Sequence, residues 1–437
     1  MFETTTLPPR YDVDSSNSNA TDNDLPAYSS LSGLGQIIPP NIIDLSSDSA
    51  PSKEFSYHVP LKGSNSSASL ILYGNAMLSK QSPAFLEGSA VNGVVKVNAE
   101  SGESINTVVV SISGKILSGA RQHVFFEYSQ PLWSLTSDGH KSESRLQGQY
   151  DWPFSLHLPK EVTMTVGTKD APRVDVFRLP QTFMERHARA SIHYEIVARF
   201  ARGLLKTDYR IIAPFVYIPI IRPEPTLPLR LEAYERNIAI PGPLADPEGW
   251  HTLAPVQIRG KLLNRQPIDV SISCRLSLAL PLSYTRGSVI PLQLDIQSND
   301  VQTLETISSP HSVICRLRRI FKYERFNPEE NKTVDPKSRR EELEHSELAT
   351  WWPSIQSSSE KDTQRTLSGE MILSSELMPT TYIGRFQLEY AVVLFPFDAN
   401  SFQPESNDIL TGCPVEIATA LPPGPRARIY TPRYQND

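Results

Sequence analysis

The residues best suited to a specific chemistry lie near the start of the chain, in the run LPPRYD. Pro8, Pro9 and Tyr11 form a PPxY motif there. Consecutive prolines preset a polyproline II helix at little ordering cost, and WW domains bind such segments in an aromatic-lined groove. Because this helix has three residues per turn, the spacing directs Tyr11 into a neighbouring pocket. The motif predicts binding of a WW domain; the alternative is an inert tail segment.

Two weaker variants of the motif accompany it. Leu25, Pro26 and Tyr28 form an LPxY sequence, and Pro432 and Tyr434 belong to a degenerate xPxY sequence, TPRY, near the C-terminus. If two motifs engage tandem WW domains of one partner, the second contact becomes intramolecular and avidity rises without any new surface.

Basic residues form a second candidate site. Four of them are expected on or beside one hairpin: Arg199, Arg202, Lys206 and Arg210. We call these four residues the basic strip. It could bind a phosphorylated or acidic segment of another protein, or anionic lipid headgroups; the alternative is a solvated, salt-bridged face. The same ambiguity applies to a second group in VICRLRRIFKYE: Arg316, Arg318, Arg319 and Lys322.

Sequence motifs of common enzyme classes are absent from the chain. It has no GxSxG, GxxxxGK[ST] or HExxH sequence. The three cysteines, Cys274, Cys315 and Cys413, form no CxxC pair, so neither a disulfide framework nor a zinc site is predicted. We expect a protein that is not an enzyme, with no cofactor, no metal site and buried or inert thiols.

Composition limits the fold and the class of partner. The 437 residues are enough for two or three domains, and the 37 prolines disfavour a mainly helical protein. Residues 1–65 hold eight acidic and three basic side chains, whereas the whole chain has a net charge of −6. The remainder is therefore nearly neutral and lacks the basic footprint of a nucleic-acid-binding protein.

The N-terminus lacks the apolar core of a signal peptide, and the longest apolar run, residues 211–221, is short and broken by prolines. We therefore expect a cytoplasmic protein. It would contact membranes only peripherally; the plasma membrane or endosomes are implied by the resemblance described below.

Apolar residues alternate with polar ones in many short runs that are separated by turn residues. In residues 191–200, for example, Ile192, Tyr194, Ile196 and Phe200 share one face. This period of two is typical of strands with one buried face, and the number of such runs favours β-sandwiches.

The predicted fold is all-β, with two tandem sandwiches. We expect a disordered tail with the PPxY and LPxY motifs at 1–65, a first sandwich at 66–222, a proline-rich connector at 223–250, a second sandwich at 251–420 with a polar insertion at 325–368, and a C-terminal tail at 421–437. The best helix candidate is SRREELEHSELATWW, residues 338–352, inside the insertion.

Several of these segments, taken as an ordered set, resemble the fungal α-arrestins, the arrestin-related trafficking adaptors. They are NGVVKVNAESGESINTVVVSISGKI, DWPFSLHLP, SIHYEIVARFARGLLKTDYRIIAPFVYIPIIRPEP and YIGRFQLEYAVVLFPF. The likeness covers roughly residues 66–420.

The resemblance implies two arrestin-like, immunoglobulin-like sandwiches without an active site. It also implies recruitment of a HECT-type ubiquitin ligase with WW domains to the cytosolic tails of transporters or receptors, for ubiquitination and endocytosis. Many members carry their PxY motifs in the C-terminal tail, whereas the strongest motif here is N-terminal.

Two alternatives remain open from the sequence. One keeps the fold but makes the protein a scaffold of a vesicle coat or a retromer-like sorting complex, with an inert PPxY motif. The other is a β-sandwich carbohydrate-binding module or enzyme. It would need stacked aromatic side chains or convergent carboxylates in a concave site, and the sequence shows no such spacing.

Overall fold

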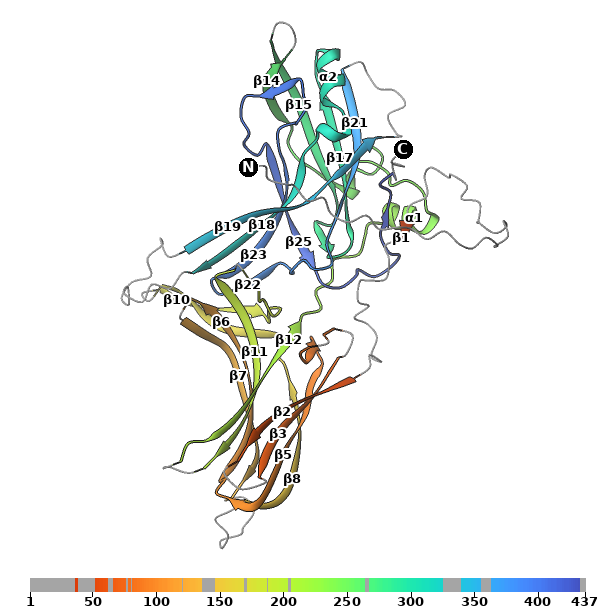
Figure 1. The fold of residues 1–437 in the computed structure, drawn as a ribbon. Coiled ribbons are helices and arrows are strands. Elements are labelled where there is room, and N and C mark those ends of the chain that lie inside the picture. Colours follow the sequence, from red (N-terminus) through yellow and green to blue (C-terminus); the bar gives the residue numbers. More distant parts are fainter. Residues whose placement is uncertain are drawn as a thin grey trace, which may run out of the picture.

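A computed structural model of the chain describes most of the residues beyond Ser52. The described residues are 36–37, 52–61, 66–75, 78–79, 81–119, 121–135, 146–168, 171–186, 188–202, 206–263, 267–324, 339–354 and 363–432. They form two β-sandwiches in tandem (Figure 1), so the prediction of an all-β fold is confirmed.

The N-terminal sandwich consists of two antiparallel sheets joined face to face. One sheet has the order β2 (Ser52–Pro60), β3 (Ser67–Asn75), β5 (Ala90–Glu103), β8 (Leu146–His157). The other has the order β4 (Ala84–Leu86), β12 (Tyr209–Ile218), β11 (Ala190–Ala201), β6 (Thr107–Ser118), β7 (Arg121–Ser134), in which short β4 runs parallel to β12. A separate hairpin joins β9 (Glu161–Thr168) to β10 (Ala171–Arg178).

The C-terminal sandwich repeats this layered plan with different strands. One sheet has the order β20 (Thr350–Pro353), β21 (Gln364–Ile372), β17 (Val289–Gln297), β15 (Ile268–Ala279), β14 (Val256–Leu262), β24 (Phe402–Pro404), and β13 (Trp250–Thr252) pairs with β15. The other has the order β16 (Ser283–Thr285), β25 (Thr411–Ala418), β23 (Phe386–Leu394), β18 (Cys315–Glu324), β19 (Arg339–Leu348), and β22 (Thr381–Ile383) pairs with β23.

Helices are few among the described residues. They are α1 (Pro228–Arg236), α2 (Val301–Ile307) and the 3-10 turns η1 (Pro247–Gly249) and η2 (Pro310–Ser312). In α1 a proline occupies the first helical position, where its missing N–H costs nothing, and left-handed Asn237 ends the helix. The predicted connector 223–250 therefore contains a helix. Neither described α-helix has the length and apolar composition needed to span a membrane.

The predicted tail boundaries were wrong at both ends. Residues 52–60 form β2, an edge strand of the first sandwich, and Phe55 is buried. The alternation of Phe55, Tyr57 and Val59 indicates this strand, but the polar residues around it make the apolar pattern weak. At the other end β26 (Arg428–Ile429) pairs with β1 (Gln36–Ile37), so the segment after residue 420 lies against the body.

The predicted helix at 338–352 was also wrong. Residues 339–348 form β19, which pairs antiparallel with β18, and Trp351 on β20 is buried. Basic residues of β18 lie opposite acidic residues of β19, for example Arg319 opposite Glu344, and such cross-strand pairs stabilise a sheet. The charges that suggested a solvated helix therefore belong to a strand pair, and the insertion 325–368 contains sheet.

The two sandwiches share a continuous hydrophobic core. Phe183, between β10 and β11, packs its ring 5.3 Å from that of Phe321 and 5.2 Å from that of Phe386, both in the second sandwich. A second junction joins Ile221 after β12 to Thr419 after β25, where the Ile221 N–H donates to the Thr419 hydroxyl at 2.8 Å. The first sandwich is thus attached to the second at two separate places.

Candidate functional site

The predicted WW-binding motifs fall almost entirely outside the described residues. This applies to Pro8, Pro9 and Tyr11, to Leu25, Pro26 and Tyr28, and to Tyr434. Their binding stays a prediction. Pro432 is the last described residue, and its surroundings can be stated.

The residues just before Pro432 are held by a buried carboxylate. Glu370 on β21 is 2% exposed and accepts hydrogen bonds from the N–H groups of Tyr430 and Thr431, each at 2.9 Å, and from the Thr431 hydroxyl at 2.8 Å. Burial raises the pKa of Glu370 from 4.5 to about 7. The C-terminal TPRY sequence therefore begins at the surface of the second sandwich.

The structure brings the basic strip together at the end of the β11–β12 hairpin that lies farthest from the C-terminal sandwich (Figure 1). Arg199 and Arg210 are directly opposite each other in the strand register. Arg199 Nε donates to Asp208 at 2.7 Å, and the guanidinium of Arg202 lies 4.4 Å from the centre of the Tyr209 ring. The Lys206 ammonium donates to the Ser104 hydroxyl at 2.7 Å.

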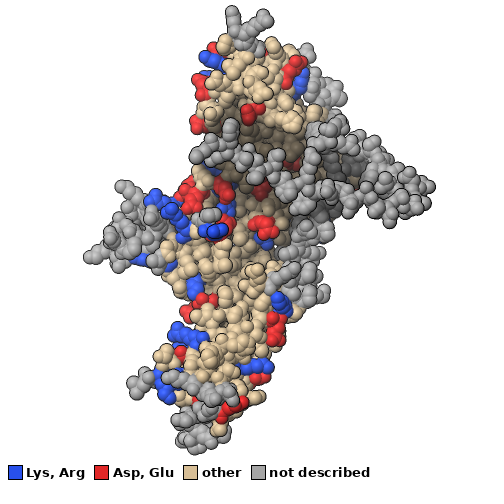
Figure 2. Space-filling model, in the orientation of Figure 1, with Lys and Arg blue, Asp and Glu red and all other residues tan. Residues whose placement is uncertain are grey.

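The basic strip is partly neutralised and partly available. Asp208 has its pKa lowered, chiefly by the hydrogen bond from Arg199. Arg199 is 54% exposed, and exposed Arg210 makes no hydrogen bond or salt bridge within the described part of the chain. Figure 2 shows basic and acidic side chains interspersed along this face of both sandwiches, in keeping with the nearly neutral body. Arg210 also contributes to the lowered pKa of Asp208, so the strip offers a small anionic partner one exposed guanidinium that is not held by a hydrogen bond.

The second basic group, on β18, has a different environment. Arg319 binds Glu185 of the first sandwich through two parallel hydrogen bonds of 2.7 and 2.8 Å and also contacts Glu344 at 2.8 Å. Lys322 contacts Glu389 at 2.5 Å. Arg319 and Lys322 are therefore paired within the protein, whereas among the described residues Arg316 donates only to the Ser346 carbonyl at 3.3 Å and Nε of Arg318 is buried without a hydrogen-bond partner.

The three cysteines are buried and free, as the sequence predicted. Burial raises the pKa of Cys274 to about 12, and it also raises the pKa values of Cys315 and Cys413. Thiols in this state are poor nucleophiles and poor metal ligands. In the described ranges no three His, Cys, Asp or Glu side chains are grouped as a metal site.

An aromatic cluster bears on the carbohydrate-binding alternative. The Tyr150 and Trp152 rings on β8 are stacked, 5.4 Å apart and 8° from parallel, and Trp133 of β7 lies 6.3 Å from Trp152. Because β7 and β8 belong to opposite sheets and the rings pack against the core, the cluster closes the edge of the sandwich. The three rings are partly buried, so much of their surface serves the sandwich itself.

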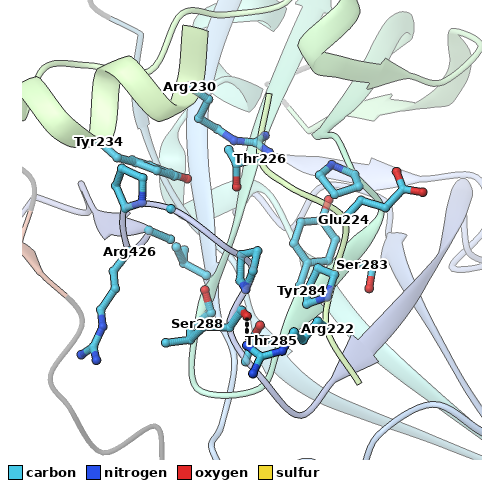
Figure 3. A pocket seen from close by; sticks show the side chains of 18 of the residues that line it. Arg222, Glu224, Thr226, Arg230, Tyr234, Ser283, Tyr284, Thr285, Ser288 and Arg426 are labelled. Atoms are coloured by element: carbon cyan, nitrogen blue, oxygen red, sulfur yellow. Dashed lines mark hydrogen bonds between the residues drawn. The ribbon is translucent and has the colours of Figure 1, made fainter. Parts of the chain in front are cut away.

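A cavity that the sequence analysis did not identify lies beside α1 (Figure 3). It has a volume of about 270 Å³. Four separate segments surround it: residues 222–226, α1, the turn from β16 into β17, and residues 421–427. Arg230 of α1 is 5% exposed, and its Nη2 donates to the carbonyl of Leu280.

The sequence carries a weak sign of this site. Arg230 shares the inner face of α1 with Ala233 and Tyr234, at the three- and four-residue spacing of one helix face. A buried arginine in that position either pairs with an acidic side chain or binds a ligand, but the spacing cannot show which.

Comparison with known proteins does not assign the chain to a family. No protein-family model matches the sequence, and no curated protein has significant similarity to it. The function must therefore be inferred from the motifs and the geometry of the chain itself.

Proposed function

We propose that the chain is an arrestin-like adaptor that recruits a WW-domain HECT-type ubiquitin ligase to plasma-membrane cargo for ubiquitination and endocytosis. The observation that carries the proposal is the PPxY motif of Pro8, Pro9 and Tyr11 ahead of a body of two tandem sandwiches. The ordered segments that resemble α-arrestins support the same assignment. The protein would act in the cytoplasm and at the inner face of the plasma membrane or endosomes.

The mechanism is proximity. The N-terminal segment tethers the ligase through its WW domains, and the sandwiches hold the cytosolic tail of a transporter or receptor. The basic strip is the surface best suited to an acidic or phosphorylated cargo tail, since Lys206 and Arg210 are exposed and Arg210 is held by no salt bridge in the described part of the chain. Transfer of ubiquitin is performed by the ligase, so no catalytic group is required of this chain.

Binding of the purified full chain to a tandem WW-domain fragment tests the proposal. We expect the wild type to bind with micromolar affinity in calorimetry. Tyr11→Ala should weaken the affinity about tenfold, which equals ~1.4 kcal/mol of binding free energy. The variant with Tyr11, Tyr28 and Tyr434 all changed to alanine should show no measurable binding. Tyr128→Ala is the matched control, because Tyr128 is exposed and belongs to no PxY sequence. Its affinity should equal that of the wild type.

The proposal is wrong if the wild-type chain does not bind the WW fragment, or if the triple variant binds as well as the wild type. The vesicle-coat or retromer-like scaffold would then be the better account of the two sandwiches. The carbohydrate-binding module has no comparable support, because the stacked rings of Tyr150 and Trp152 serve the sandwich core.

A further inference from the structure

The cavity beside α1 contains a positive charge that has no counter-charge. Nε and Nη1 of Arg230 are buried and have no hydrogen-bond partner, so three of its five N–H groups lack an acceptor. Within the described residues no carboxylate lies at salt-bridge distance from this guanidinium. A buried, unpaired charge is strongly unfavourable, and proteins retain one mainly where a partner is supplied.

The other charges around the cavity do not neutralise Arg230. Figure 3 shows the carboxylate of Glu224 directed away from the Arg230 guanidinium, and Arg426 extending away from the cavity. Arg222 lies at the rim, where its Nη1 donates to the Leu421 carbonyl at 3.0 Å. Arg230 therefore remains a buried charge that these groups leave without a partner.

Hydroxyl groups add neutral donors to the walls of the cavity. Thr226, Ser283 and Ser288 line the cavity, and their side chains make no hydrogen bond within the described part of the chain. The Tyr234 hydroxyl points toward the same space (Figure 3), and burial raises its pKa to about 12, so it keeps its proton.

Two further hydroxyls at the wall are already occupied. Tyr284 donates to the Ala279 carbonyl at 2.5 Å and Thr285 donates to the Ala420 carbonyl at 2.7 Å. Of the free hydroxyl groups, those of Thr226 and Tyr234 lie nearest to Arg230 in Figure 3, whereas Ser283 and Ser288 line other parts of the wall.

We propose that this cavity binds a phosphate group, either as inorganic phosphate or as the terminal group of a small phosphomonoester. A phosphate offers three strongly accepting oxygens in a tetrahedral arrangement, which suits a buried guanidinium together with hydroxyl donors on different walls of one cavity. A carboxylate offers two oxygens in one plane and leaves more of these donors unpaired. The cavity volume of about 270 Å³ corresponds to about nine water molecules, so it admits a phosphate with an attached organic group.

The proposed ligand would join distant parts of the chain. Residues 421–427 form one wall of the cavity and lead directly into β26, which pairs with β1. A bound phosphate would therefore also stabilise the docking of the C-terminal segment. The inference is independent of the proposed adaptor function, because it uses neither the PxY motifs nor the basic strip.

Calorimetric titration of the full-length protein in phosphate-free buffer tests the site. The probes are inorganic phosphate and glycerol 3-phosphate, with sodium chloride at matched ionic strength as the blank. We expect saturable, submillimolar binding and a rising thermal midpoint with either probe. Tighter binding of glycerol 3-phosphate would identify a phosphomonoester site, and equal or weaker binding would identify free phosphate.

The variants separate the buried arginine from general surface charge. Arg230→Met should weaken phosphate binding at least tenfold. The variant is expected to fold, because the substitution removes an unpaired buried charge and keeps the volume of the side-chain stem. Arg236→Met is the matched control, since Arg236 lies on the same helix, is 69% exposed and does not line the cavity, and the affinity of this variant should be unchanged. Thr226→Val combined with Ser288→Ala keeps Arg230 and should weaken binding several-fold.

The inference is overturned if the wild type shows no saturable binding of either probe beyond the chloride blank. It is equally overturned if folded Arg230→Met binds phosphate as tightly as the wild type. If Arg230→Met fails to fold, the variant with Thr226→Val and Ser288→Ala provides the test. An unchanged phosphate affinity in that variant contradicts the proposed phosphate site.

Discussion

The basic strip of the first sandwich and the strand β18 of the second are both rich in basic residues, but their side chains differ in exposure and in pairing. Both place several arginines and a lysine within about ten residues. Arg199 in the strip is 54% exposed and pairs with one carboxylate at the hairpin end, whereas Arg319 on β18 is 22% exposed and is shared between Glu185 and Glu344. The difference shows that the surrounding strands, not the run of basic residues, decide whether the charge is available to a partner.

The carboxylates show the same contrast. Asp208 beside the basic strip has its pKa lowered, first by the hydrogen bond from Arg199, whereas buried Glu370 in the second sandwich has its pKa raised by desolvation to about 7. One carboxylate favours its charged form in the folded protein, and the other favours its neutral form. Their effects on stability must therefore depend on pH with opposite signs.

The largest effect on stability is expected at Glu370, and it tests the contrast between the two carboxylates. Its pKa is raised in the folded state, so its contribution to stability is present below about pH 4.5 and is lost as the pH rises through 7. Relative to Glu370→Gln, the wild type should lose up to about 3 kcal/mol of unfolding free energy between pH 5 and pH 8. Urea unfolding of both proteins across this range measures the difference.

Asp208→Asn is the control of opposite sign for that experiment. Because the pKa of Asp208 is lowered, its contribution is present above its ordinary pKa and is lost as the pH falls below about 4. Between pH 5 and pH 8 the difference between Asp208→Asn and the wild type should stay constant. A flat difference for Glu370→Gln as well would remove the contrast between the two carboxylates.

The next largest effect is expected at Arg319. Changing it to methionine removes two parallel hydrogen bonds to Glu185 and leaves that carboxylate, which is 29% exposed, without its partner. We expect a loss of about 2 kcal/mol in urea unfolding, between the values for exposed and fully buried pairs. A double-mutant cycle with Glu185→Gln should show coupling of similar size, and the absence of coupling would contradict the role of this pair.

The smallest effect is expected at Arg199. Arg199→Met breaks the salt bridge to Asp208, but the arginine is largely exposed, so water and salt screen the interaction. The unfolding free energy should fall by no more than about 0.5 kcal/mol, and even this should disappear in high salt. A cost as large as that of Arg319→Met would break the comparison between the two basic groups.

Much of the fold could be predicted because the strands bury one face. Val108, Val110 and Ile112 on β6 alternate in sequence and are all fully buried, and Cys274 follows the same pattern on β15. The strand β19 could not be predicted from its own residues. Its acidic side chains are explained only by the basic side chains of β18 across the sheet, and sequence periodicity does not contain that pairing.

The candidate sites were predictable to different extents. The basic strip is local, because Arg199 and Arg210 flank one turn, so the sequence could bring its residues together. The cavity around Arg230 is not local, since its walls come from four segments between residues 222 and 427. Such a site has no motif, and it becomes visible only when the buried guanidinium is found without a partner.

The two junctions between the sandwiches limit how these bodies can move. The contacts at these junctions are extended, because Arg319 of the second sandwich also binds Glu185 of the first and the two sandwiches share one core. One junction is Phe183 with Phe321 and Phe386, and the other is Ile221 with Thr419. A partner that contacts both sandwiches therefore meets a surface whose two parts are already held together, and little orientational entropy is lost when it binds.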